Sequence, residues 1–184
     1  MRIMISALEN EFTKLEHQLA ELQQMVKPLS AAQQNFRPET DGWSILQVFR
    51  HLIQSEGQIN RYLHKKILGA PAAGTAGLSA RIRSLILNFA MRLPLRYKAP
   101  EVIKVDFEVH YDYEPLITAW QQQRLDLRAF LETIDEANAK KELFRHPVAG
   151  LMSLSQGLTF MQEHLDRHAR QVGRIMRSSG FPKK

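Results

Sequence analysis

Two histidines near the C-terminal end of the chain, His164 and His168, have the spacing of a pair of metal ligands. Residues four apart on an α-helix lie on one face, with their side chains about 6 Å apart. Two neutral imidazoles in this arrangement can bind one cation at the zinc–nitrogen distance of about 2.0–2.1 Å. The same spacing also fits a solvated helix face or a hydrogen-bonded pair, so by itself it leaves these interpretations open.

The sequence around this pair excludes several other kinds of site. The helical metalloprotease motif requires a glutamate directly after its first histidine, and Leu165 occupies that position. The chain contains no cysteine, which excludes disulfides, thiolate zinc sites, iron–sulfur clusters and a cysteine nucleophile. A metal bound by His164 and His168 would therefore need a third ligand other than a thiolate.

His51 is the best candidate for that third ligand. It lies one to two turns from the expected start of its helix, on the flank of the helix rather than on its apolar midline. His64, beside two lysines at the other end of the same helix, is expected at the surface. His110 and His146 lie in connections, where no helical register fixes their direction, and either could approach a cleft.

Four long segments with helical periodicity must position these histidines. In the first, apolar residues recur at alternating steps of three and four, which is typical of a helix in a bundle. Capping-box spacing at Ser44 and at Ser153 predicts the starts of the second and fourth, and Pro115 is tolerated in the first turn of the third. The segments are 5–26, about 44–68, a third opening near Asp112, and about 153–177.

These segments predict an all-α protein, an up-and-down-type four-helix bundle with a short extra helix in the connection between its second and third helices. The extra helix is expected from about Ser79 to Met91, after a linker of small residues at 69–77. Alternation within residues 102–109 predicts a short extended piece. The length of the chain allows one domain over residues 1–184.

The net charge of +6 is concentrated in one segment, residues 81–98, which has no acidic residue. Its basic residues are Arg81, Arg83, Arg92, Arg96 and Lys98. A solvated helix face is the simplest explanation, and a surface that binds nucleic acid or an anionic membrane is the alternative. Nucleic acid is not the expected partner.

Hydropathy predicts neither a membrane span nor a secretory signal. No apolar run approaches the length that crosses a bilayer, and the N-terminal sequence turns acidic before an apolar secretory core forms. We therefore expect a cytoplasmic protein.

Several other side chains are candidates for the pocket or for orienting the imidazoles: Gln47, Glu56, Tyr62, Gln171, Glu163 and Asp166. Glu56 falls on the apolar side of its helix, where a carboxylate needs a partner. An arginine from a facing helix is the structural explanation, and a general base in the pocket is the functional one. Trp43 and Trp120 are expected as core anchors, with substrate stacking as the alternative.

Two stretches resemble the DinB-like metalloprotein superfamily, which includes a YfiT-like branch. The stretch DGWSILQVFRHLIQSEGQI is similar to its second helix, where a Trp-Ser start is followed by a helical His and Leu. The stretch HPVAGLMSLSQGLTFMQEHLDRHARQVGRI is similar to its fourth helix, where two histidines lie four apart. The order of elements also fits, with 79–111 the least characteristic part. The resemblance implies that His51, His164 and His168 bind a divalent metal, most often zinc or nickel.

The resemblance also implies a range of functions. Relatives include metal-dependent hydrolases and S-transferases that use a low-molecular-weight thiol, and many form homodimers, so a small-molecule substrate and a homodimer are expected. Three imidazoles would leave the metal a free position, as in catalytic sites. The sequence favours an enzyme of either kind without deciding the question. A non-catalytic metal- or ligand-binding bundle protein and a binder of anionic surfaces remain alternatives.

Overall fold

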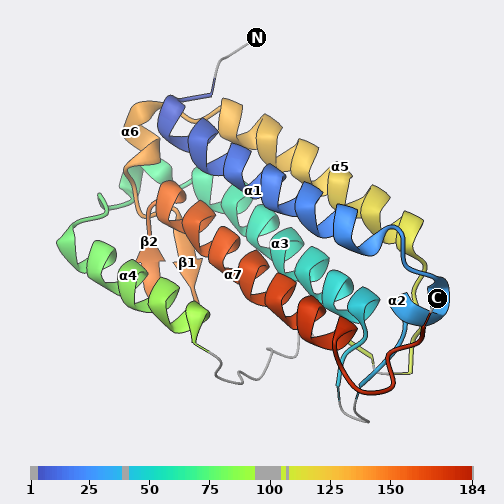
Figure 1. Cartoon of the computed structure of the whole chain (residues 1–184). Helices are drawn as coiled ribbons and strands as arrows, with labels where there is room; N and C mark the ends of the chain where they lie inside the picture. The colour runs from blue at the N-terminus through green and yellow to red at the C-terminus, as the bar shows by residue number, and fades with distance from the viewer. Residues whose placement is uncertain (1–3, 39–41, 94–104, 107, 184) are drawn as a thin grey trace.

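The computed structural model describes residues 4–38, 42–93, 105–106 and 108–183. Four long helices lie alongside one another (Figure 1), which confirms the predicted all-α four-helix bundle. The long helices are α1 (Ser6–Val26), α3 (Ile45–Ile67), α5 (Tyr113–Glu132) and α7 (Leu154–Met176). The short elements are α2 (Ala31–Gln34), η1 (Ala70–Ala72), α4 (Leu78–Arg92), α6 (Glu136–Ala139), β1 (Phe144–His146) and β2 (Gly150–Met152).

Apolar periodicity and capping explain where the long helices form. The seam of α1 is buried from Leu8 to Val26, because residues three and four apart share one face. At the starts of α3 and α7, Ser44 and Ser153 each accept a hydrogen bond from a backbone N–H three residues on. In return, the side-chain oxygen of the glutamine at that position accepts a hydrogen bond from the backbone N–H of the serine, so both predicted capping boxes are present.

The order of the helices around the bundle is α1, α7, α3, α5. Close packing joins α1 to α7, α7 to α3, and α3 to α5, and ion pairs from Glu9 and Glu16 join α1 to α5. The first two long helices of the chain therefore lie across the diagonal of the bundle. This order makes α3 and α7 neighbours, although more than 80 residues separate them along the chain.

The connection between α3 and α5 contains the predicted extra helix, α4, which packs against α7 and β2. The hairpin of β1 and β2, with Phe144 paired to Met152, was not predicted, because strands of three residues carry almost no periodic signal.

Of the extended piece expected at 102–109, positions 102–104 and 107 lie outside the described residues, and the remainder forms no strand. Arg96 and Lys98 of the basic segment also lie outside the described residues. No helix among the described residues is long and apolar enough to cross a membrane.

The hairpin packs closely against the first turn of α7 at Gly157. A Cβ atom added there would lie 2.7 Å from Cγ of Phe144, so we expect Gly157→Ala to lower the free energy of unfolding by about 1–3 kcal/mol. Gly173→Ala is the matched control on the same helix, because its Cβ would meet only the mobile end of Arg177. The control should gain up to about 1 kcal/mol from helix propensity, and urea unfolding of both variants measures the difference. Equal stability of the two would contradict the close contact.

Candidate metal centre

Three histidines from two packed helices come together in the bundle. The structure places His51 of α3 beside His164 and His168 of α7, with one ligand nitrogen from each ring within 4.8 Å of the others. His51 and His168 are 4% and 8% exposed, whereas His164 keeps a larger solvent-accessible edge. Of the three rings, that of His164 is therefore the most exposed to solvent, although it is still partly buried.

The distances among the rings suit a shared cation. The Nε2 atoms of His164 and His168 lie 3.2 Å apart, and two nitrogens of a tetrahedral zinc site are about 3.3 Å apart at ordinary bond lengths. The ring of His51 lies 4.8 Å from that of His168 and 5.4 Å from that of His164, centre to centre. The donor set contains only imidazole nitrogens, which zinc and nickel both accept. The residues present therefore fit a divalent transition metal.

Gln171 fixes the direction of one of these rings. Nδ1 of His168 lies 2.8 Å from Oε1 of Gln171, and since a carbonyl oxygen only accepts, Nδ1 carries the proton. In the neutral ring the lone pair is then on Nε2, which faces His164. Gln171, one turn further along α7, thus holds His168 in the form that can bind a metal.

Because of this role, we expect Gln171→Leu to lower metal affinity by about 10–100-fold, the usual effect of losing a group that orients a ligand. The change should leave metal stoichiometry at saturation unaltered. Zn²⁺ and Ni²⁺ titration by calorimetry measures both quantities. Gln121→Leu, at an exposed position of α5, is the control and should match the wild type. An unchanged affinity in Gln171→Leu would show that the hydrogen bond does not tune the site.

Burial keeps the two histidines of α7 neutral. Burial, followed by repulsion from His168 and His51, holds the pKa of His164 well below its usual value of 6.5. Burial, together with repulsion from His51, lowers the pKa of His168 to about 3, although the hydrogen bond to Gln171 works in the opposite direction. At neutral pH both rings therefore offer a lone pair without first losing a proton.

These pKa values predict acid sensitivity of the metal-free protein. Between pH 6.5 and 3 the unfolded chain binds a proton at His168 and the folded chain does not, so stability falls as the pH drops through this window. At pH 5 we expect a loss of about 2 kcal/mol from His168, with His164 acting in the same direction. Urea unfolding at pH 7.5 and 5 should show a smaller loss in His168→Gln. His17→Gln, at an exposed histidine, should show the full loss, and a wild-type stability that does not change with pH would contradict the prediction.

Aromatic side chains enclose the three imidazoles on two sides. Trp43, just before the capping residue of α3, packs on His51 at 4.8 Å and stacks on His168 at 6.2 Å, both between ring centres. On the other side Phe160 stacks on His164 at 5.6 Å. Trp120 is fully buried, as expected of a core anchor, but Trp43 is half-buried and belongs to the wall of this site.

His146, on strand β1, is the closest of the histidines expected in connections. Its ring packs on Phe160 at 4.6 Å between centres, which places it behind the aromatic wall. Its Nδ1 atom accepts bonds from the backbone of Val148 and Ala149, and burial lowers its pKa to about 4. His64 packs on Phe130 at the surface, and His110 is exposed.

Most of the other candidate residues are engaged elsewhere. Gln47 caps α3 and donates to the carbonyls of Asp106 and Val109. Tyr62 lies eleven residues after His51, which is about 16 Å along a helix and too far to touch its ring. Glu163 pairs with Arg92 of α4.

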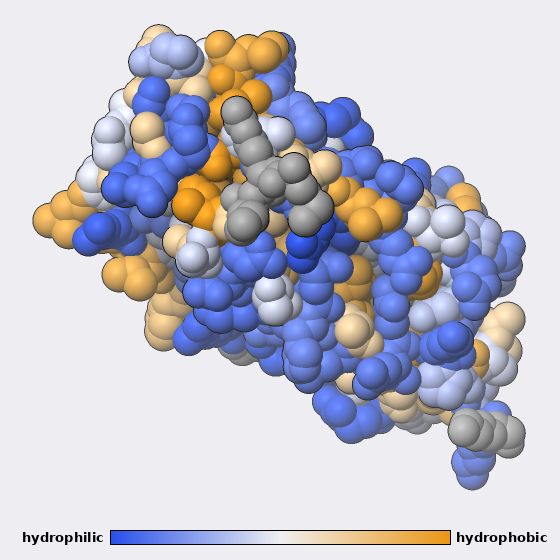
Figure 2. Space-filling model, turned by 90° about the horizontal axis from the view of Figure 1, so that it is seen from above, coloured by the Kyte–Doolittle hydropathy of each residue, from blue (hydrophilic) through white to orange (hydrophobic). Residues whose placement is uncertain are grey.

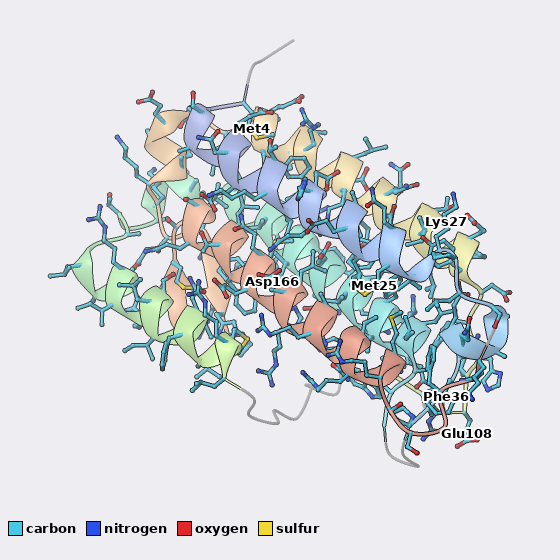
Figure 3. All side chains as sticks on the ribbon, in the orientation of Figure 1. Met4, Met25, Lys27, Phe36, Glu108 and Asp166 are labelled. Carbon is cyan, nitrogen blue, oxygen red and sulfur yellow. The ribbon has the colours of Figure 1, made fainter. Side chains whose placement is uncertain are left out.

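Asp166 is also turned away from the imidazoles. It lies midway along α7 (Figure 3) and accepts a hydrogen bond from Gln18 of α1. It is two residues from both His164 and His168, and positions two apart point to opposite sides of a helix.

Glu56 forms a buried ion pair rather than part of the metal-binding group. Its carboxylate accepts two bonds from Arg124 of α5, at 2.7 and 2.8 Å, and one from the indole N–H of Trp120. Glu56 and Arg124 are 5% and 2% exposed. The structural explanation of Glu56 is therefore the correct one. Its carboxylate points from α3 toward α5, where its arginine partner lies.

A four-helix bundle with a three-histidine group shared between two helices defines the class of this protein. The sequence pattern of the DinB superfamily matches residues 14–172, and the chain belongs to that superfamily. The fold is also that of YfiT from Bacillus subtilis, described as "a probable metal-dependent hydrolase with an unusual four-helix bundle topology". That comparison has a TM-score of 0.55 and 17% sequence identity, and covers 95% of this chain and 89% of YfiT. No curated protein matches the chain in sequence.

Proposed function

We propose that the protein is a metal-dependent enzyme that acts on a small molecule, with His51, His164 and His168 as ligands of a divalent zinc or nickel ion. The observation that supports this most directly is the cluster of three imidazoles within 4.8 Å on two packed helices. Structural zinc sites have four protein ligands, whereas catalytic sites have three and keep one position for a water or a substrate.

The reaction we propose is hydrolysis or the transfer of a low-molecular-weight thiol. Held by three uncharged ligands, the metal would polarise a substrate and ease loss of a proton from a water or a thiol. The protein's own groups hold the site in shape: Gln171 orients His168, while Trp43 and Phe160 cover the outer faces of the rings. The description of YfiT supports the hydrolytic reaction. We further propose that the chain works as a cytoplasmic homodimer.

Activity of the metal-loaded protein on panels of esters, amides and thiol acceptors tests this proposal. We expect turnover on at least one panel, and its loss in His168→Ala at the same protein concentration. If the wild type binds one metal ion per chain and is as inert as His168→Ala on every panel, the protein is a metal-binding bundle without catalysis.

A further inference from the structure

Helix α4 has one apolar side toward the bundle and a second toward solvent. Ala80, Leu87 and Met91 face the bundle and are buried. The outer side carries five large apolar side chains that are 49–72% exposed: Leu78, Ile82, Leu85, Ile86 and Phe89. A helix at the surface of a globular protein normally turns polar residues to the solvent. The outer face of α4 is therefore apolar where a surface helix would normally be polar.

The five side chains form a continuous patch. Four of them, at positions 78, 82, 85 and 89, recur at steps of four, three and four, which aligns them in a stripe about 16 Å long. Half of the ten exposed large apolar side chains in the described residues are on this single helix. Figure 2 shows a largely hydrophilic face on which hydrophobic residues are most frequent toward the left end, the end at which α4 lies in Figure 1. A concentrated apolar patch of this kind marks an interaction surface.

The stretch of sequence that ends with α4 carries an excess of positive charge. Residues 57–93 contain six basic residues and no acidic one, which leaves 19 of each in the remainder. Arg83 and Arg92 are paired with Glu142 and Glu163. Arg81 on α4 is exposed and forms no ion pair with any described residue. The apolar stripe therefore lies beside one exposed arginine, Arg81, whose charge no described acidic residue offsets.

This combination selects one kind of partner. Two copies joined through α4 would bring their Arg81 side chains into one interface, and α4 has no acidic residue to offset them. An anionic lipid surface provides what the region lacks, because its headgroups are negative and its acyl boundary accepts apolar side chains. We infer that α4 docks the protein onto anionic membranes, with the helix parallel to the bilayer and Leu85 and Phe89 inserted among the headgroups. This inference is independent of the proposed enzyme, since the histidines are on α3 and α7.

Co-sedimentation of the full chain with vesicles tests the inference. We expect binding to phosphatidylcholine vesicles that contain about 30% phosphatidylglycerol, little binding to pure phosphatidylcholine, and weaker binding at high salt. Leu85→Ser/Phe89→Ser should bind the anionic vesicles at least about tenfold more weakly, and Arg81→Gln about fivefold more weakly. Leu125→Ser, at a 61% exposed leucine of α5, is the matched control and should bind as the wild type does.

Three outcomes would overturn the inference. They are absence of wild-type binding to anionic vesicles at low salt, equal binding of Leu85→Ser/Phe89→Ser, and a lipid-free dimer that this double variant dissociates into monomers. The last outcome, measured by light scattering, would assign the patch to contact between copies of the chain. Circular dichroism of the double variant should match the wild type, because both substituted positions are exposed.

Discussion

His168→Ala should abolish stoichiometric metal binding. We expect about one divalent ion per chain in the wild type and less than about a tenth of that in the variant, because two remaining imidazoles bind far more weakly than three. The affinity for the metal should fall by more than the about 10–100-fold that follows removal of a residue that hydrogen-bonds to a metal ligand. His168 is 8% exposed, and its Nε2 atom is 3.2 Å from that of His164. Among the described residues, His51, His164 and His168 are the only group of three His, Asp or Glu side chains close enough to share a metal ion. Elemental analysis of purified protein measures the result.

Two further variants make this prediction specific to a site shared between helices. His51→Ala should lose the metal as completely as His168→Ala does, although its helix is separate. His64→Ala, at an exposed histidine of the same helix as His51, should retain it. If His51→Ala kept a full complement of metal, His164 and His168 would bind the metal without His51, and the prediction of a three-histidine site would be wrong.

Arg124→Met should lower the free energy of unfolding by about 3–5 kcal/mol, a large fraction of the stability of a domain of this size. Burial alone would lower the pKa of Arg124, but the carboxylates of Glu56 and Glu16 outweigh it and raise that pKa. Removing the guanidinium leaves the Glu56 carboxylate buried with only the indole N–H of Trp120 as a partner. An uncompensated buried charge is costly, and this cost dominates the expected change. Urea unfolding at pH 7.5 measures it.

Arg128→Met provides the control for that experiment. Arg128 lies one turn further along α5, is 43% exposed and pairs with Glu9 and Glu132, so its removal should cost no more than about 1 kcal/mol. Glu56→Gln/Arg124→Met should recover part of the stability lost in Arg124→Met, because the buried charge is gone. Equal costs for Arg124→Met and Arg128→Met would show that the buried ion pair of Arg124 contributes no more to stability than the exposed pairs of Arg128.

The sequence determined the local features of the fold. Steps of three and four predicted the buried seam of α1, and the spacing of Ser44 and Ser153 to their glutamines predicted the caps of α3 and α7. The spacing of His164 and His168 placed them on one face, which the structure shows. These features could be predicted because helical geometry and capping depend on residues within about one turn of each other.

The position of His51 could be anticipated only in part. Its helical register placed it on the flank of α3, and the resemblance to the DinB superfamily singled it out from the other histidines. Only the packing of α3 against α7 brings its ring within reach of the other two. That packing is set by side chains distributed over both helices, so no local pattern encodes it.

The tertiary structure alone decided which of two roles several residues have. Glu56 fitted an ion pair or a general base until Arg124 on α5 was found opposite it. Trp43 fitted the core but lies against His51 and His168. In each case the deciding partner lies far away in the sequence, and the pairing of distant segments depends on how the whole core packs rather than on neighbouring residues.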